Sequence, residues 1–540
     1  MVANRTSTQE GRLGLVTSLS RLPLLSVASG TLISRASGLL RVLVLAYVLG
    51  FTPLADAFNL ANTVPNMLFD LVLGGVASAT FIPVFIERLA LDGERRAWRS
   101  ISSVLSFSLV VLLLASALAW LLAPFIIGSF TVWTHASGAG GAQVLAQRDV
   151  AVSFLRWFIP QIFFYGVIGL MGTLLNIRQK FGAVAWAPIT NNIVCCLVLF
   201  WFHLVDPSPT LASLHGDGHL AWLGVGTTLG VAIQATVLIP SLSRSSLHRL
   251  RFRWNLRDPA LATIARLGSW TVLVILANQI SLFVVLACAF TIGGQGPISA
   301  YTYGWSFMQM PYAVVVVSVL NVLTPRLAEH AARGERLEFR ERLGAGVRES
   351  LAIIIPLSFL LVVLAQPVVA LFLHHGDASH RLAAGTVLAI LVAGLPGFTI
   401  FQVCVRGLQT LQRARDVFWL YLGQNILTVA GILLIGRHSL GGLVASIALA
   451  YSLAAGGALL VLHEQGVTLW EDVFSWAVGR TVASSLGAAF ASALAYSLFT
   501  SVSGFGLLLR TGFSVLFGAG SFFALTYWRK QRATPAAQKV

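Results

Sequence analysis

Residues 24–50 read LLSVASGTLISRASGLLRVLVLAYVLG, an apolar stretch that carries two arginines, Arg35 and Arg41. The stretch is long enough to cross a bilayer as a helix, yet an arginine near the centre of such a helix costs about 2.5–3.5 kcal/mol. A charge kept at that depth normally faces a water-filled cavity or a partner. Because the guanidinium fork of donors fits phosphate groups, the stretch predicts an aqueous cavity that binds an anionic cargo.

Apolar runs of this length recur along nearly the whole chain. The 540 residues are 56% hydrophobic and 10% charged, with a mean hydropathy of +0.81, whereas soluble proteins carry roughly 25% charged residues. The runs do not alternate in polarity as barrel strands do, so we expect an all-α polytopic membrane protein with 14 transmembrane helices. The expected spans are 24–50, 56–86, 100–128, 150–177, 184–203, 219–241, 264–291, 299–325, 349–373, 382–405, 416–436, 440–463, 474–500 and 505–528.

Positive charge is distributed unevenly between the predicted loops. Of the 36 Lys and Arg residues, 28 lie in segments or span ends on the side of the N-terminus, four lie in loops or span ends on the other side, and four lie deeper within spans. This positive-inside bias places both termini of a protein with an even number of spans in the cytoplasm. The net charge of +16 therefore reflects membrane topology rather than nucleic-acid binding. One inside segment, 463–473, departs from the pattern because it has no Lys or Arg.

The N-terminal run and the cysteines predict no processing and no metal. The first apolar run contains arginines and lacks a small-residue cleavage site, so we expect it to be retained rather than removed as a signal peptide. The four cysteines, Cys195, Cys196, Cys288 and Cys404, fall in predicted spans at spacings that match no metal motif. We interpret them as packing residues and expect neither a metal nor a cofactor.

The first twelve predicted helices contain two similar halves. Five residues of the first half recur 233 residues later: Gln179, Lys180, Trp186, Asn192 and Ile193 correspond to Gln412, Arg413, Trp419, Asn425 and Ile426. The prolines Pro65 and Pro83 likewise correspond to Pro311 and Pro325. Because a shift by six helices preserves orientation, we expect two parallel, pseudo-symmetric six-helix lobes around a central cavity, with a site near mid-membrane.

The repeat sets the predicted domain organisation, in which the last two helices lie outside the two lobes. The segments are a cytoplasmic N-terminal segment (1–23), an N-lobe (24–241), a basic cytoplasmic linker (242–263), a C-lobe (264–463), helices 13 and 14 (474–528) and a cytoplasmic tail (529–540).

The charged candidates for the cavity lie in helices 1 and 2. Arg35 and Arg41 are six residues apart, about 240° around a helix, so either helix 1 bends near Gly38 or the cavity is wide. Arg41 could instead reach an interface or pair with Asp56 or Asp70, and Arg35 could reach the cytoplasmic interface. Asp70 lies well inside helix 2, where a buried carboxylate requires a partner such as these arginines. Asp56 opens helix 2 and could equally cap it.

Polar residues in helices 2, 7 and 8 complete the candidate set. They either line the cavity or form hydrogen bonds between helices: Asn66, Asn278, Gln279, Ser306 and Gln309. We expect hinge or close-packing roles for a second set: Gly38, Pro65, Gly74, Gly75 and Pro311. Helix 8 also carries aromatic residues that could form an interfacial belt: Tyr301, Tyr303, Trp305 and Tyr312.

The residues favour a transporter over an enzyme. A polyprenyl transferase would need paired carboxylates to hold Mg²⁺ beside a diphosphate, and the predicted cytoplasmic mouth has no such pair. No nucleophile–base arrangement stands out elsewhere in the sequence.

Several short motifs, taken in order, resemble one family. They are Ser34-Arg35…Gly38…Arg41, Ala55-Asp56-Ala57-Phe58, Pro65-Asn66, Leu175-Asn176…Phe181…Ala187-Pro188…Asn192 and Leu371-Phe372…His375-Gly376. From about residue 24 to 430 the chain is similar to the MurJ/MviN lipid II flippases of the multidrug/oligosaccharidyl-lipid/polysaccharide exporter superfamily. The resemblance implies two six-helix lobes around a central cavity, with two extra helices that form a hydrophobic groove.

The match to the family's functional residues is partial. Arg41 matches a cavity arginine on which the family depends, and Arg35 and Asp56 match other recurrent polar positions. Three positions depart from the pattern: Val42, where many members have Asp, and Phe69 and Ser306, where basic residues are usual. The implied cavity is less positive than in the best-known members. Carboxylates of the second lobe lie only at helix ends, so we expect no sodium site.

The resemblance implies a flippase that moves lipid-linked peptidoglycan precursor (lipid II) from the inner to the outer leaflet of the bacterial cytoplasmic membrane by alternating access. Arg35 and Arg41 would hold the diphosphate–sugar head group, and the lipid tail would follow helices 13 and 14. The implied partners are this undecaprenyl-diphosphate-linked precursor, membrane lipids and cell-wall synthesis proteins. Two alternatives stay open: an exporter of another polyprenyl-linked glycan or a cationic drug, and a non-transporting scaffold for cell-wall assembly.

Overall fold

The computed structural model describes residues 6–74, 80–133, 139–211, 218–243, 250–292, 296–372, 378–499 and 504–537. These ranges form helices with short connections and contain no strand. Within them, eleven helices are long and apolar enough to cross a membrane, or up to twelve if the bent pair Arg381–Ala393 and Leu395–Thr410 is one span. The predicted all-α, multi-pass membrane fold is therefore confirmed, while the total of 14 spans stays a prediction.

The helices pack into two compact units whose segments alternate along the chain. Unit 1 comprises Met1–Leu45, Ala61–Ile126 and Asp149–Val272, and unit 2 comprises Ala46–Leu60, Ile127–Arg148 and Leu273–Val540. The elements before residue 250 are α1 (Thr6–Leu49), α2 (Pro53–Phe69), η1 (Asp70–Gly74), α3 (Ile82–Leu91), α4 (Glu94–Leu121), α5 (Ala123–Phe130), α6 (Ala139–Phe158), α7 (Pro160–Ile177), α8 (Phe181–Val205) and α9 (His219–Ser243). The later elements are α10 (Pro259–Thr291), α11 (Pro297–Pro311), η4 (Tyr312–Val316), α12 (Val317–Arg333), α13 (Arg336–Phe372), α14 (Ala378–Ala393), α15 (Leu395–Thr410), α16 (Ala414–Leu434), η5 (Gly436–His438), α17 (Leu440–Glu464), α18 (Trp470–Val473), α19 (Trp476–Ser497) and α20 (Gly504–Ala537).

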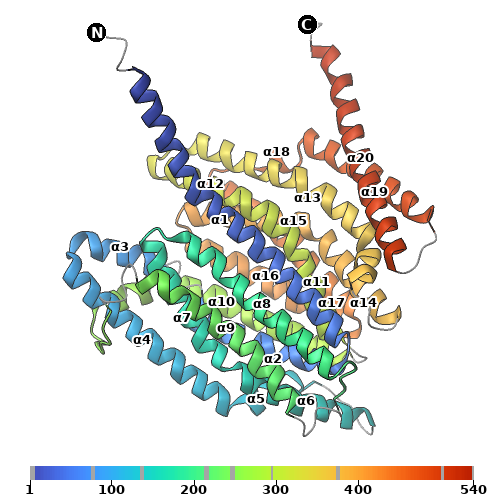
Figure 1. Ribbon diagram of the computed structural model, residues 1–540. Helices are drawn as coiled ribbons and strands as arrows, with labels where there is room; N and C mark the ends of the chain where they lie inside the picture. The colour runs from blue at the N-terminus through green and yellow to red at the C-terminus, as the bar shows by residue number, and fades with distance from the viewer. Residues whose placement is uncertain are drawn as a thin grey trace. The chain divides into compact units, whose positions relative to one another are not determined.

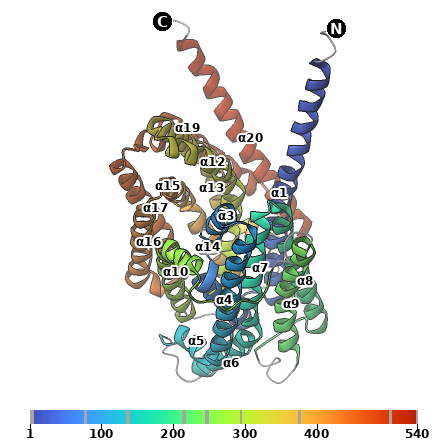
Figure 2. The ribbon, with the colours of Figure 1, turned by 90° about the vertical axis from the view of Figure 1, so that its left-hand side faces the viewer.

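In unit 1, helices α4, α7, α8 and α9 lie side by side (Figures 1 and 2). Glycines allow their backbones to approach closely. A Cβ atom on Gly166 of α7 would collide with Leu112 of α4, and one on Gly226 of α9 would lie 2.6 Å from Val198 of α8. Small residues stabilise helix pairs in this way within a bilayer, where apolar burial alone gives little preference for helix–helix over helix–lipid contact.

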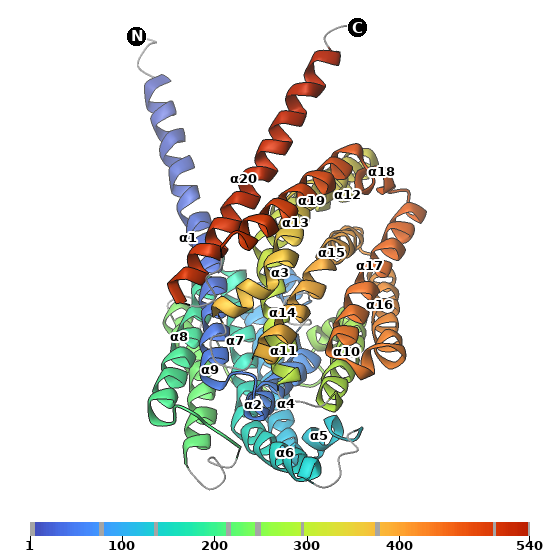
Figure 3. The same cartoon turned by 90° about the vertical axis from the view of Figure 1, so that its right-hand side faces the viewer.

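In unit 2, α13 packs against α12, α14, α15 and α19 (Figure 3). Leu343, Val347, Leu351 and Ile354 are each at most 1% exposed and recur at helical spacing. They form one apolar face along the first half of α13, and this face carries the contacts of the unit's core.

The connection that precedes the fifth helix of each predicted lobe has the same backbone conformation in both. Gln179 and Gln412, 233 residues apart, have φ angles of 56° and 58°. In each turn the next backbone N–H donates to the carbonyl five residues earlier, at 2.9 Å. Non-glycine residues rarely adopt the left-handed region. The shared conformation therefore supports the internal repeat that the sequence predicts at these positions.

Matched irregularities also occur in the second helix of each predicted lobe. The π-helical segments η1 and η4 begin 242 residues apart, η1 shortly after Pro65 and η4 directly after Pro311. These segments divide the second helix of each predicted lobe into shorter regular helices; α2, for example, has only 17 residues. It is therefore not among the helices long enough to count as a span. Short π-helical segments recur at functional sites. The hinge and packing roles of Gly38, Pro65, Gly74 and Pro311 stay predictions, and Gly75 lies outside the described residues.

The segment 463–473, which the sequence predicts to lie inside and which has no Lys or Arg, forms ion pairs with arginines of a neighbouring helix. Its Asp472 is 3% exposed and forms ion pairs with Arg348 and, at 3.5 Å, with Arg340 of α13. The Nε atom of Arg340 also donates to the carbonyl of Thr468, at 3.0 Å. The segment therefore lies on the same side of unit 2 as the arginine-rich start of α13.

Asp472→Ala is expected to lower the free energy of unfolding by about 2–3 kcal/mol, because it leaves two arginines without their buried carboxylate. Partial exposure of both guanidinium groups keeps the loss below that of a fully buried pair. Glu471→Ala is the matched control, since that side chain is 85% exposed and its loss should cost less than about 0.5 kcal/mol. Thermal unfolding in detergent, followed by circular dichroism, compares the two variants. Equal stability would contradict the role assigned to Asp472.

Candidate functional site

The two arginines of helix 1 lie in different surroundings within unit 1. Arg35 is exposed, whereas Arg41 is half-buried. The guanidinium of Arg41 lies within hydrogen-bonding reach of the Cys195 thiol on α8 and within electrostatic reach of Tyr165 on α7. α1 continues as a helix through Gly38, so the first of the two alternatives, a bend near Gly38, does not take the form of a break in the helix. Arg41 is thus held against two neighbouring helices, and the cavity expected around both arginines stays a prediction.

Tyr165 connects Arg41 with the second helix. Its ring centroid lies 5.9 Å from that of Phe69, and its hydroxyl is within hydrogen-bonding reach of Asn66. The same hydroxyl donates to Gln161 Oε1, at 3.3 Å. One cation and several hydrogen-bonding groups therefore lie beside an aromatic surface. Such a surface can bind an anion through charge-assisted hydrogen bonds and offer apolar contact area next to it.

The asparagines of the sequence repeat occupy corresponding places in the two units. Asn192 Nδ2 on α8 donates to Ser37 Oγ on α1, at 2.9 Å. Asn425 Nδ2 on α16 donates to Asn278 Oδ1 on α10, at 2.7 Å. In each predicted lobe, an amide of the fifth helix thus bonds to the first helix. Of the two roles considered for Asn278, the structure provides the hydrogen bond between helices.

Asp56 caps a helix other than its own, within unit 2. The residue is 2% exposed, and its Oδ1 accepts hydrogen bonds from the backbone N–H of Ser299 at 2.8 Å and from its Oγ at 2.7 Å. Ser299 lies in the first turn of α11, where backbone N–H groups have no intrahelical partner. Thr52 caps α2, because its Oγ1 accepts from the N–H of Ala55 at 3.1 Å. The interpretation of Asp56 as the cap of helix 2 is therefore wrong, and the carboxylate joins α2 to α11.

The remaining polar candidates have local or partial contacts. Asn66 and Asp70 are exposed, and Asp70 begins η1. The side chains of Asn66 and Ser306 each donate to the carbonyl four residues earlier in their own helix. Gln279 and Gln309 are half-buried. Their roles in binding stay predictions, as does a pairing of Asp70 with the arginines of helix 1.

The aromatic residues of the predicted eighth span lie in α11 and η4 and contact other helices of unit 2. Tyr303 is 1% exposed and Tyr301 is 7% exposed. The rings of Trp305 and Tyr312 contact Phe398 of α15, with centroids 6.5 Å and 4.8 Å apart. The expected interfacial belt is therefore wrong for Tyr301 and Tyr303, which are buried, whereas Trp305 and Tyr312 are half-buried and pack against α15.

Comparison with known proteins identifies one family across most of the chain. The family model for lipid II flippase MurJ matches residues 45–519. A probable lipid II flippase MurJ from Buchnera aphidicola is 28% identical over 385 residues, which cover 71% of this chain and 71% of that protein. The lipid II flippase MurJ of Burkholderia cenocepacia is 26% identical over 419 residues, or 75% and 76% of the two chains.

Solved structures show the same fold. A structure of lipid II flippase MurJ in an inward closed conformation aligns with a TM-score of 0.74 at 20% identity, covering 94% of this chain and 99% of that one. An inward-facing multidrug transporter of the MATE family aligns with a TM-score of 0.66 at 14% identity, covering 79% and 94%. An outward-facing one aligns with a TM-score of 0.58, covering 82% and 95%. The fold therefore accommodates transporters that open to either side.

Proposed function

Because the chain belongs to the lipid II flippase MurJ family, we propose that it moves lipid II from the inner to the outer leaflet of the bacterial cytoplasmic membrane. The observation that carries this proposal is the family match, which extends over residues 45–519. The family consists of transporters, and the helices of this chain are those of a multi-pass membrane protein. The cargo would be the undecaprenyl-diphosphate-linked precursor itself.

The proposed movement is alternating access of two lobes. It is supported by the similarity of the chain to both inward-facing and outward-facing transporters of this fold. The matched π-helical segments η1 and η4 are candidate hinges, because irregular turns concentrate local changes of backbone angle. The predicted lobes 24–241 and 264–463 are the bodies that would move.

The proposed head-group site is centred on Arg41, with Arg35 as a second cation on the same helix. A guanidinium beside polar side chains can hold a diphosphate by charge-assisted hydrogen bonds. Asn66 and Tyr165 would add neutral hydrogen bonds next to it. The polyprenyl tail would lie along the segment 474–528, where many large apolar side chains are exposed.

The proposed topology places both termini in the cytoplasm. This orientation is supported by the 28 Lys and Arg residues in the segments or span ends on the side of the N-terminus. An inside-negative membrane potential would then favour outward movement of the anionic head group. Cell-wall synthesis proteins are the proposed protein partners.

Leaflet-specific labelling of lipid II tests the function in cells that rely on this chain alone. We expect lipid II in the outer leaflet and sustained growth after the resident flippase is depleted. Accumulation of lipid II in the inner leaflet despite expression of the chain would overturn the proposal. Growth with that accumulation would favour the scaffold, and outward movement of a different polyprenyl-linked glycan would favour the other exporter.

A further inference from the structure

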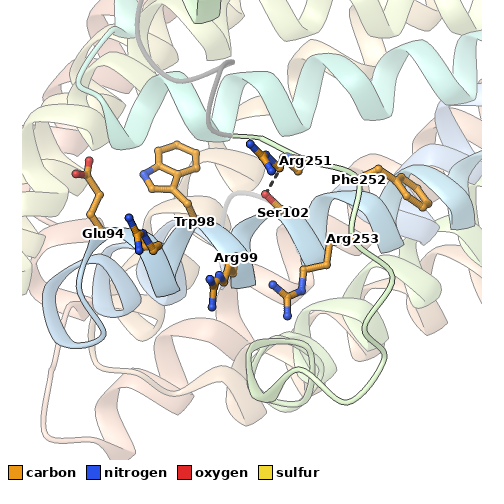
Figure 4. A pocket seen from close by; sticks show the side chains of 8 residues that line it. Glu94, Trp98, Arg99, Ser102, Arg251, Phe252 and Arg253 are labelled. Carbon is orange, nitrogen blue, oxygen red and sulfur yellow. Dashed lines mark hydrogen bonds between the residues drawn. The ribbon is translucent and has the colours of Figure 1, made fainter.

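A cavity of about 720 Å³ lies in unit 1, away from α1 and its arginines. It is formed by the first turns of α4 and by the connection that follows α9 (Figure 4). The lining residues are Glu94, Arg95, Trp98, Arg99, Ser102, Arg251, Phe252 and Arg253. Neither the proposed function nor the comparisons give this cavity a role.

The cavity has an excess of positive charge. Four arginines line it, all are exposed, and none has an ion pair with an acidic side chain in the part of the chain that the structure describes. The single acid, Glu94, lies 3.8 Å from the guanidinium of Arg178, which is outside the lining set. The lining therefore favours a ligand with concentrated negative charge, and guanidinium groups fit phosphate oxygens bidentately.

Two of the four arginines, Arg251 and Arg253, lie on an extended segment that runs along α4 (Figure 4). The backbone N–H groups of Arg251 and Arg253 donate to Ser102 Oγ at 3.3 Å and Ser106 Oγ at 2.9 Å. Two serines four residues apart on a helix are separated by about 6 Å, which matches the rise of about 6.6 Å over two extended residues. Trp254 adds a ring contact with Phe107 of α4, at 6.2 Å. Arg251 and Arg253 are therefore attached to α4 by their backbone N–H groups, which leaves their guanidinium groups available for a ligand.

A second, apolar cavity of about 420 Å³ shares Ser102, Arg251 and Phe252 with the first. It extends between three helices that are candidate membrane spans, α4, α7 and α9. Its apolar lining residues are Leu105, Leu109, Phe163, Val167, Leu170, Met171, Leu174, Ile239, Leu242 and Leu250. A cationic cavity thus opens directly onto an apolar groove within the membrane-spanning part of the unit.

We propose that these two cavities form one binding site for an anionic phospholipid, with its phosphate among the four arginines and one acyl chain in the groove. The positive charge of the first cavity favours a phosphate group. Because the apolar groove adjoins this cavity, a ligand with a long apolar chain next to its phosphate fits both. Phe252, which is 75% exposed, lies at the junction, as interfacial aromatic residues do. A phospholipid bound in this way would link the basic connection before α10 to the membrane through its phosphate.

Photo-crosslinking on the purified full chain tests this site. The probe is phosphatidylglycerol with a diazirine on its acyl chain, and labelled peptides are mapped by mass spectrometry. We expect labels on α4 and α7 around the groove. The double substitution R251E/R253E should reduce labelling there by about tenfold or more, because it replaces attraction to the phosphate with repulsion. Arg257→Glu is the matched control, being an exposed arginine of the same connection outside the lining, and should leave labelling unchanged.

Other outcomes separate the possible ligands. Unchanged labelling in the double variant, or equal labelling by a phosphatidylcholine probe, would overturn the proposal. Displacement of the probe by millimolar glycerol phosphate would assign the site to free phosphate groups and would overturn its lipid part. Leu109→Trp, which fills the groove, should lower labelling by phosphatidylglycerol. If R251E/R253E does not fold, R251Q/R253Q tests the same charges. No lipid II is present, so the result does not depend on flipping activity.

Discussion

Arg41→Ala is expected to reduce lipid II flipping by about 100-fold or more while the protein remains folded in the membrane. Loss of a partly buried charge that binds an anionic group costs about 2–5 kcal/mol, and each 1.4 kcal/mol is a factor of ten. The fold should tolerate the change, because the contacts that the structure gives Arg41 among the described residues are with a phenol and a thiol, neither of which requires a cation beside it. Leaflet-specific labelling in flippase-depleted cells measures the effect.

Two further substitutions serve as controls. One tests whether the charge of Arg41 suffices without its donor geometry, and the other tests whether any arginine of a predicted span is required. Arg41→Lys keeps the charge but loses the planar fork of donors, so we expect activity between those of the wild type and Arg41→Ala. Arg156→Ala removes another arginine of a predicted span, whose guanidinium lies 5.4 Å from the ring centroid of Trp120. It should leave flipping near normal. Full activity of Arg41→Ala would remove Arg41 from the proposed head-group site.

Features that depend on local pattern were predictable from the sequence. The apolar runs and the absence of alternation predicted helices throughout, and the described residues contain only helices and their connections. The residues Gln179 and Gln412 were recognised as equivalent from sequence, and they share a left-handed backbone conformation. The number of spans was harder to predict, because prolines and π-helical segments divide apolar runs into shorter helices.

Features that depend on distant contacts were not predictable. Asp56 was recognised as a candidate cap, but its partner Ser299 is 243 residues away and is placed by tertiary packing. Tyr165 gave no signal beyond being an aromatic residue in an apolar run, although it lies between Arg41 and Asn66. Asn192 and Asn425 were identified as a repeated pair but not as candidates for the site. Their correspondence, once combined with the polar residues of the predicted first and seventh spans (α1 and α10), could have predicted the bonds between helices.

The cationic cavity of unit 1 could not be predicted from the distribution of charge along the sequence. Arg251 and Arg253 counted only toward the orientation of the protein, since many inside segments are basic. Their proximity to Arg95 and Arg99 depends on two serines of α4 that bind an extended backbone segment. Serines in an apolar helix are common, so their spacing of four residues carried no signal until the connection was placed beside them.

Asp56→Ala is expected to lower the free energy of unfolding by about 2 kcal/mol and to loosen the start of α11. The substitution leaves the buried N–H and hydroxyl of Ser299 without their acceptor, and an unsatisfied buried group costs about 1–3 kcal/mol. Asn59 also donates to Ser299 Oγ, at 3.0 Å, so the loss extends to a neighbouring bond. Thermal unfolding in detergent measures the stability, and hydrogen exchange of the first turn of α11 measures the local effect.

Asp56→Asn is the matched control, because the amide retains one acceptor oxygen and loses only the charge at the helix N-terminus. That charge is worth about 0.3–1 kcal/mol near a surface and up to about 2 kcal/mol when partly buried, so the Asn variant should be more stable than the Ala variant. Asn59→Ala removes the adjacent donor and leaves the cap, so exchange in the first turn of α11 should stay slow. If Asp56→Ala and Asp56→Asn exchange at the wild-type rate, the carboxylate does not hold α11. Asp56 would then be available for the role in binding that the family resemblance suggests.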